Sequence, residues 1–485
     1  MSSKRLILVL FVVLFILLRA HGINIYRWPL GDLKIAFPAQ KNELNLYHYS
    51  GNSAWLQASD SLNWMTVAFN SNNTRGSLRK YWEAYGLSQN IISFSGQKHV
   101  SANRVFFGKM SYNMDFHQDV NKAIELNPYA PDPFVPCDSV QGNFSYMGPQ
   151  IKAVFSQRLG RRFWWGAGLD YQIYQGLKQV YSRPEVIQRK IKLDLSIAFA
   201  ISSRVIAGFS VRPYDELEII KLVKQPDGTS PVIYRYRGEF LFKTVTGTED
   251  RNARTKGWEV LPQIMFNFDK WKAVVHAGYF YQWHEVYDNP LLHHYEGYYQ
   301  GQNYYLSIIA RYFLSASLKS ALTFRYKLHK LKDWAEEPVK KLAIYQSWQR
   351  KQQFLFGYSG QLFDGQPLVL GFEGEYNRYL PDKRDFLAHV FRKALISDWA
   401  VKIGASYNPF RSSSFAATLW LKKYDEPAVW NYLENYQAVG GTLNFNFNYR
   451  NFFWMISTKF AKYEGLINHR IRGNLNFQLQ LRRFL

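Results

Sequence analysis

The sequence predicts an all-β protein, a single transmembrane antiparallel β-barrel of roughly 14–18 strands. Three observations predict it. Side chains alternate between apolar and polar over long stretches, aromatic residues cluster where such strands would end, and the chain finishes on an alternating segment. Each observation is common to membrane-spanning strands, and together they favour a barrel over a soluble β-sandwich.

The alternation has a period of two residues. Between residues 191 and 201 every odd position is apolar, whereas the even positions include Lys192, Asp194 and Ser196. The same period recurs in residues 318–329, 399–408 and 443–450. A helix would mix these polar residues into the apolar stripe. The stretches run for about 9–14 residues, which exceeds the usual 5–6 of soluble strands and suffices to cross a bilayer.

The connections and the chain end fit the same architecture. Tight turns at residues 159–162 and 408–411 alternate with longer polar connections, and residues 121–140 form a proline-rich stretch expected to be a surface loop. Alternation in residues 475–482 continues to the last residues, as a closing barrel strand requires. Leu387, Phe391 and Leu395 are spaced by four, which fits either a short loop helix or a strand.

The first residues predict export. Lys4 and Arg5 precede an apolar run over residues 6–18, and small residues follow, as in a secretory signal peptide cleaved after Gly22. The expected organisation is therefore a signal peptide at 1–22 and an outer-membrane β-barrel at 23–485. An uncleaved N-terminal anchor is the alternative.

Composition excludes several classes. The chain has 485 residues, of which 47% are hydrophobic and 20% charged, so disorder is not expected. Cys137 is the single cysteine, which rules out an intramolecular disulfide and any multi-cysteine metal site. Aromatic residues reach 18% and cluster at 163–165, 279–283, 298–305 and 452–454, which suits girdles at two membrane interfaces.

Two segments resemble known barrel families. Residues 45–56, Asn-Leu-Tyr-His-Tyr-Ser-Gly-Asn-Ser-Ala-Trp-Leu, are similar to an N-terminal segment of several outer-membrane barrel families with a Gly-Asn-Pro-Ala core, with Ser53 in place of the proline. Residues 132–142 resemble a stretch in a porin-like family of the Bacteroidota type. The resemblance implies a porin-like or transporter-like barrel of unassigned substrate, and it carries over no catalytic residue.

The polar faces of the strands supply the candidate ligand-binding residues. If the apolar faces meet lipid, basic side chains on the opposite faces point into the lumen and favour anions. These residues are Lys192, Lys272, His276, Lys319, Arg325, Lys327 and Lys402. Alternatively they pair with lumenal carboxylates and only fill the interior. The net charge of +23 could also serve to bind lipopolysaccharide phosphates.

Other chemistries have little support. His276 and His284 share strand parity but lie too far apart for one metal shell, and His293-His294 resembles a loop pair, so no metal or cofactor is predicted. The chain contains no Gly-x-Ser-x-Gly, P-loop or His-Glu-x-x-His motif, and no enzyme activity is predicted. The basic residues are spread over many strands, which argues against nucleic acid as a partner.

The sequence therefore predicts a pore or transporter for small solutes, with a preference for anions, in a Gram-negative outer membrane. Its expected partners are outer-membrane lipid and lipopolysaccharide and the barrel-assembly machinery. Two alternatives stay open. One is a barrel that is filled inside and binds partners through its loops, and the other is a secreted β-rich protein that binds carbohydrate through its aromatics.

Overall fold

The structure is a computed structural model. It describes residues 45–59, 62–79, 83–120, 124, 133–138, 140–180, 183–222, 228, 232–238, 241–247, 250–288, 294–314, 320–337, 339, 341–361, 368–410, 413–426, 435–449, 452–466 and 470–484. The predicted signal peptide lies outside these residues, as does Lys319. None of the helices in this part of the chain is long and apolar enough to cross a membrane.

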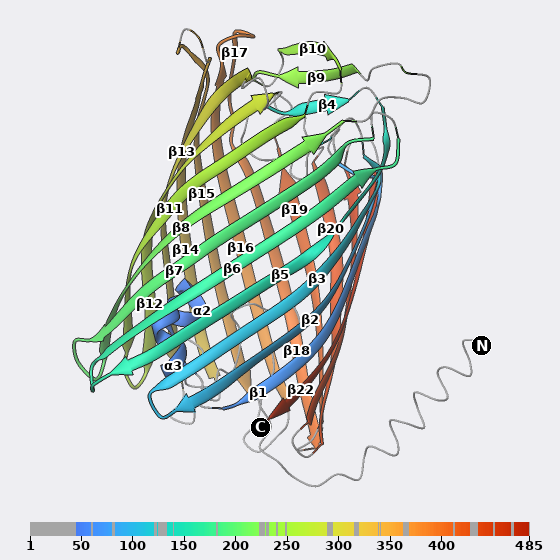
Figure 1. The fold of residues 1–485 in the computed structure, drawn as a ribbon. Helices are drawn as coiled ribbons and strands as arrows, with labels where there is room; N and C mark the ends of the chain where they lie inside the picture. The colour runs from blue at the N-terminus through green and yellow to red at the C-terminus, as the bar shows by residue number, and fades with distance from the viewer. Residues whose placement is uncertain are drawn as a thin grey trace.

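An antiparallel barrel of 18 strands forms the body of the molecule (Figure 1). Each strand pairs with its neighbours along the chain, and β1 pairs with β22 to close the sheet. The barrel strands are β1 (Trp64–Gly76), β2 (Gly86–Ser101), β3 (Arg104–Val120), β5 (Gly142–Leu159), β6 (Phe163–Lys178), β7 (Glu185–Ala200), β8 (Val205–Lys221), β11 (Arg251–Asn267), β12 (Trp271–Asp288), β13 (His294–Phe313), β14 (Ser320–Glu336), β15 (Ala343–Gln361), β16 (Leu368–Asp385), β18 (Ile396–Phe410), β19 (Ser413–Asp425), β20 (Tyr436–Tyr449), β21 (Phe452–Gly465) and β22 (Ile471–Phe484). The predicted fold class is confirmed, at the upper end of the predicted strand number.

The two faces of the barrel follow the predicted alternation. On β7, Leu193 and Leu195 are exposed on the outer surface, whereas Ser196 and Ala198 are buried on the inner one. On β18, Ile403 points outward and Lys402 inward. The outer surface is therefore an apolar band suited to lipid, and polar side chains line the lumen.

The strands are longer than the sequence suggested. They run from 13 residues in β1 to 20 in β13, because the pairing continues past the alternating apolar stretch into more polar residues. The aromatic clusters contribute side chains to both faces of the barrel. Trp165 and Trp454 are each the third residue of a strand, β6 and β21, whereas Tyr299 is buried inside the barrel. Only part of each cluster therefore belongs to an interfacial girdle.

The two ends of the barrel differ. Short turns, such as residues 102–103 and 160–162, join strands at the end where β22 finishes, whereas longer connections gather at the opposite end (Figure 1). Short turns are periplasmic and long loops extracellular in outer-membrane barrels, which orients the molecule. We call these the inner and outer ends.

The outer end carries a second, small sheet. It consists of β4 (Pro136–Asp138), β9 (Val232–Tyr236) and β10 (Phe242–Thr246), in the order β10-β9-β4 (Figure 1). We call it the lid sheet. β4 comes from the stretch predicted to be a surface loop, so part of that loop is folded structure, with Phe134 buried. Phe391 lies on β17 (Val390–Lys393), which pairs with β16, so of the two readings the strand is correct.

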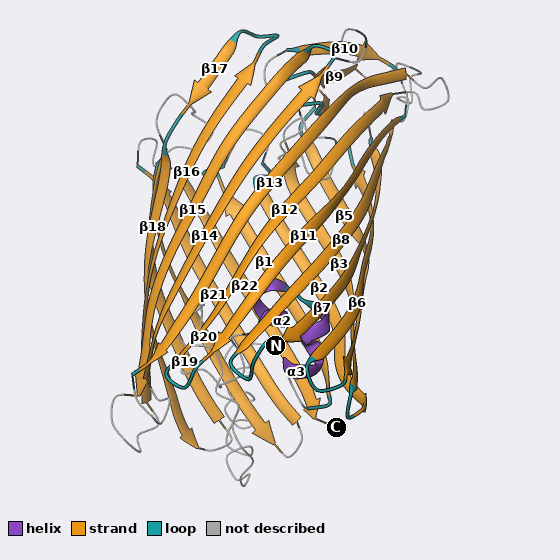
Figure 2. Ribbon diagram, turned by 90° about the vertical axis from the view of Figure 1, so that its left-hand side faces the viewer, coloured by secondary structure: helices purple, strands orange, loops and turns teal. Residues whose placement is uncertain are grey.

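A short segment lies inside the barrel near its inner end (Figures 1 and 2). It comprises α2 (Leu46–Ser50), η1 (Ser53–Trp55) and α3 (Leu56–Ser59), and we call residues 45–59 the lumenal segment. It contacts the inner faces of β3, β5, β6, β7, β11 and β12. This is the segment whose sequence resembles the N-terminal motif of other barrels.

Candidate functional site: the lumen and its docked segment

The local structure of the lumenal segment follows from its asparagines and one glycine. Asn45 caps α2, since its side chain accepts a hydrogen bond from the backbone N–H of His48. Gly51 ends the helix in the left-handed conformation, with φ of 69°. Asn52 then caps η1 by accepting from the backbone N–H of Ala54. Gly51 and Asn52 therefore form the turn that joins α2 to η1.

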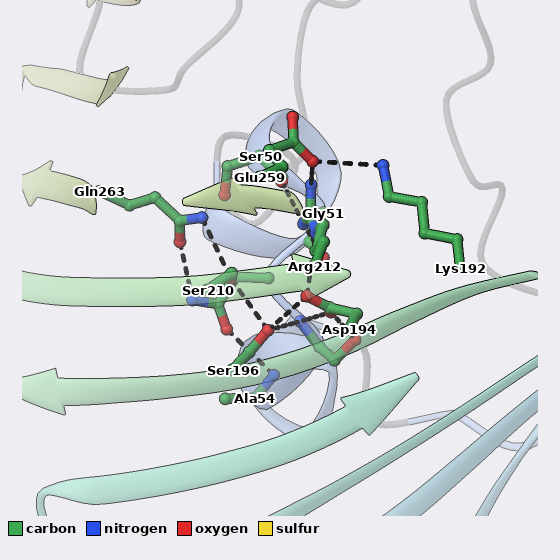
Figure 3. Close-up of polar contacts among 12 residues, drawn as sticks. Ser50, Gly51, Ala54, Lys192, Asp194, Ser196, Ser210, Arg212, Glu259 and Gln263 are labelled. Carbon is green, nitrogen blue, oxygen red and sulfur yellow. Dashed lines mark hydrogen bonds and ion pairs between the residues drawn. The ribbon is translucent and has the colours of Figure 1, made fainter. Parts of the chain in front are cut away.

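Arg212 on β8 connects the segment to the barrel (Figure 3). Its Nη2 atom donates to the backbone oxygens of Ser50 and Gly51, each at 2.7 Å. Its Nε atom donates to Asp194 on β7 at 2.9 Å, and its Nη1 atom lies 3.4 Å from Glu259 on β11. One guanidinium therefore joins two wall carboxylates to the end of α2, in the forked geometry that arginine favours.

A second set of hydrogen bonds holds η1. Asn52 Nδ2 donates to Gln263 Oε1 at 2.7 Å and to the carbonyl oxygen of Ile197 at 3.1 Å. Ser53 donates from its hydroxyl to Asp194, and Ser156 on β5 donates to the carbonyl oxygen of Ala54. The segment therefore bonds to polar groups of β5, β7 and β11, within an arc of five adjacent strands.

Small and apolar residues of the wall also contact the lumenal segment. A Cβ atom on Gly166 would lie 2.5 Å from the backbone of Ser53 and Ala54, so only glycine allows this approach. Trp55 packs edge-on against Trp164 at 4.8 Å between ring centroids. Burial raises the pKa of Tyr47 to about 12, with the nearby Asp194 carboxylate adding to the effect, so this phenol stays protonated.

Six of the seven predicted site residues fall on described strands, and all six lie at lumen-facing positions. Lys192 pairs with Glu259 at 3.2 Å, and Lys402 with Glu373 at 3.2 Å. Lys272 is buried on β12, and His276 lies edge-on to Tyr305. Arg325 and Lys327 are two residues apart on β14, opposite outward-facing Phe324. The residues are therefore spread around the wall, and at least two of them pair with carboxylates, as the alternative interpretation held.

One sector of the wall is distinctly basic. The inner faces of β12 to β15 carry Lys272, Arg311, Arg325, Lys327 and Lys351. The acidic residues on these strands are Asp288, Glu296 and Asp333. Glu373 and Glu375 on the adjacent β16 also lie close enough to Arg325 to interact with its charge. The sequence analysis missed Lys351 and Arg311, and it also missed Arg212, although each sits on the polar side of an alternating strand. Groups of His, Cys, Asp and Glu that could hold a metal ion do not occur within the described residues.

The closed pairing, the apolar outer band and the polar lumen define an outer-membrane β-barrel protein. Residues 53–482 match the sequence profile of a family of unknown function, DUF6850. The chain belongs to this family.

Three solved structures align with this chain at low sequence identity. CdiB from Acinetobacter baumannii has a TM-score of 0.36 at 10% identity, with 86% of this chain aligned to 60% of that one, so this chain spans less than two thirds of its length. The outer membrane transporter YddB from Escherichia coli has a TM-score of 0.45 at 7% identity over 88% and 81% of the two chains. A FadL homologue from Pseudomonas aeruginosa has a TM-score of 0.36 at 9% identity over 96% and 99%. No curated protein matches the sequence.

Proposed function

We propose that this protein passes small solutes across the outer membrane through its lumen, with a preference for anions. The observation that carries the proposal is the basic inner sector on β12 to β15. A barrel of 16–18 strands encloses an aqueous lumen wider than its own side chains fill. A wall with one sign of charge raises the local concentration of ions of the opposite sign.

The position of the lumenal segment supports passage rather than a filled interior. Its described residues contact mainly the arc from β3 to β12, and its apolar side chains also reach Ile309 of β13 and Leu355 of β15. Lys327 and Lys351 lie closer to the outer end than Leu355 does, so part of the basic sector continues past the segment toward that end. A solute would thus travel past the segment along the basic wall.

The remaining expectations are part of the same proposal. They are cleavage of residues 1–22, insertion by the barrel-assembly machinery, contact with lipopolysaccharide and kinship with porin-like barrels of the Bacteroidota type. The absence of a catalytic motif favours a transport role over an enzymatic one.

Ion selectivity in planar bilayers tests the proposal. Under a KCl gradient, the wild-type barrel should give a reversal potential displaced toward chloride. The Arg325→Met/Lys327→Met variant should lower the chloride-to-potassium permeability ratio by about two-fold or more. Lys330→Met is the matched control, because this lysine lies on the same strand but is exposed on the outer face. Inserted barrels that show no conductance steps would instead support the non-conducting alternative.

A further inference from the structure

The lid sheet extends over the outer mouth of the barrel from two loops. β4 lies in the connection between β3 and β5, and β9 and β10 lie in the connection between β8 and β11. β9 pairs with both neighbours, with Arg235 opposite Pro136 on one side and Lys243 on the other. Figure 1 shows all three strands at the outer end of the barrel, and Figure 2 shows β9 and β10 there. Its strands have only three to five residues, too few to be stable without the barrel.

Two apolar anchors fix the lid sheet to separate parts of the wall. Phe134, next to β4, packs with residues of β12 to β15, namely Val286, Tyr299, Ala335, Ile344 and Tyr345. Its ring lies against Gly297, where any Cβ atom would clash with it. Ile233 on β9 packs with residues of β3, β5, β7 and β8, namely Val120, Phe144, Tyr146, Val186 and Ile220. The sheet therefore reaches between two arcs of the mouth.

Buried ion pairs make up the rest of the attachment. Arg235 on β9 lies 3.0 Å from Asp288 on β12, and Arg237 lies 2.6 Å from Glu296 on β13. Asp288 and Glu296 are almost completely buried, at 0% and 2% exposed. On the other arc, Lys178 at the end of β6 pairs with Asp138 of β4 at 2.7 Å, and both are buried.

The chemistry of this attachment suits reversible opening. A buried ion pair gains little net stability, because the cost of removing both charges from water offsets most of their attraction. When the pair separates into water, hydration replaces the lost contact. An attachment built mainly of apolar surface would not recover its energy in this way. The ion pairs lie beside the apolar anchors, so both kinds of contact separate when the sheet opens.

We propose that the lid sheet is a gate over the outer mouth of the lumen, that the Arg235–Asp288 and Arg237–Glu296 ion pairs form when it is closed, and that it opens to admit solute. This inference rests on the proposed transport function. Removing one partner of a pair leaves the other charge buried and unpaired in the closed gate, which favours the open one.

Labelling of Cys137 tests the gate without measuring transport. This single cysteine of the chain lies on β4, opposite Tyr234 of β9. Asp288→Asn removes the charge that Arg235 and Arg251 share, and should speed maleimide labelling of Cys137 in intact cells by about ten-fold. The control, Asp382→Asn, alters a more exposed pair with Arg384 near the same end and should leave the rate unchanged. Equal rates in wild type and Asp288→Asn would overturn the gate.

A cross-link tests whether opening controls passage. Gly238 lies beside Asp385 of β16, since a Cβ atom on Gly238 would be 2.8 Å from Asp385 Cγ. Because Gly238 has a φ of 94°, which strains a cysteine, resistance of the reduced variant to SDS first verifies that its barrel is folded. In the Cys137→Ser background, the oxidised Gly238→Cys/Asp385→Cys variant should lose at least about 80% of wild-type conductance, and dithiothreitol should restore it. Unchanged conductance on oxidation, with the disulfide verified by mass, would overturn the gate. If wild type and Asp288→Asn are both silent in bilayers, the transport function fails instead, and Cys137 labelling still decides whether the sheet moves.

Discussion

Arg212 donates a 2.7 Å hydrogen bond from Nη2 to the backbone oxygen of Ser50, across 162 residues of sequence. The same side chain binds Asp194 on the neighbouring strand, so it links the wall to the end of α2. Because a charged donor within a partly buried site is worth about 1.5–3 kcal/mol per hydrogen bond, this single residue contributes strongly to docking of the lumenal segment.

Arg212→Met should release the lumenal segment and leave the barrel folded. Loss of the guanidinium leaves Asp194 without its cation and two carbonyl oxygens without a donor. A nitroxide at Ala58→Cys, in a Cys137→Ser background, reports on the segment, because Ala58 is exposed. Its spectrum should change from one dominated by immobilised label to one dominated by mobile label.

The control for that experiment is Arg254→Met. Arg254 of β11 likewise pairs with an aspartate of the neighbouring strand, Asp215 of β8, but this pair is solvent-exposed. An exposed pair contributes at most about 1 kcal/mol, so the nitroxide spectrum should stay that of the wild type. A mobile label in Arg254→Met, or an immobile one in Arg212→Met, would contradict the role given to Arg212.

Gly166→Ala should also displace the segment, for a steric reason. The added methyl group would meet the backbone of Ser53 and Ala54, which cannot shift like the end of a flexible side chain. Gly374→Ala is the matched control, because nothing lies within 4 Å of the Cβ position there. The nitroxide at position 58 should gain mobility in the first variant alone. Equal spectra for the two would show that the close approach at Gly166 does not occur.

Alkaline pH should weaken docking through Tyr47. The pKa of this phenol is about 12 in the docked segment, against about 10 for an exposed tyrosine. The protonated phenol stabilises the docked state fully below pH 10. This stabilisation falls as the pH rises, and the loss reaches roughly 2 kcal/mol near pH 12. The nitroxide should therefore gain mobility between pH 10 and 12 in the wild type. Tyr47→Phe should flatten this dependence, and an identical titration in both proteins would exclude Tyr47 as its source.

A charge on the lipid-facing surface should destabilise the barrel. Leu195 is 58% exposed near the middle of the outer face of β7. Leu195→Arg should lower the free energy of unfolding in lipid vesicles by about 2–4 kcal/mol, as measured by tryptophan fluorescence in guanidinium chloride. Leu466→Arg, just beyond the end of β21, should change it by less than about 1 kcal/mol. Equal losses would show that the apolar band does not meet lipid.

The barrel wall could be predicted because neighbouring residues of a strand point to opposite faces, so their polarity shows which face meets lipid. Leu195 and its neighbour Asp194 differ in polarity, and that difference alone sets which one meets lipid. Strand length was underestimated, since the pairing outlasts the apolar alternation. Phe391 was ambiguous because β17 is a strand of only four residues with no buried side chain, too short to show a period.

The lumenal segment and the lid sheet could not be predicted, because their contacts are not local. Asn52 bonds with Gln263 across 211 residues, and Arg235 meets Asp288 at a strand end with no alternation to mark it. The resemblance of residues 45–56 to other barrels marked the first of these segments but gave no position for it. Such residues come together only when the barrel closes, and the residue pattern of a single strand does not contain that information.

Solute entry into proteoliposomes tests the central claim most directly. Refolded barrel, verified by its resistance to SDS before boiling, should admit a small organic anion such as gluconate faster than a cation of similar size such as N-methylglucamine. This order of rates is the predicted result, because the basic sector on β12 to β15 lines the path. Entry no faster than in protein-free vesicles, for both solutes, would contradict a transport role.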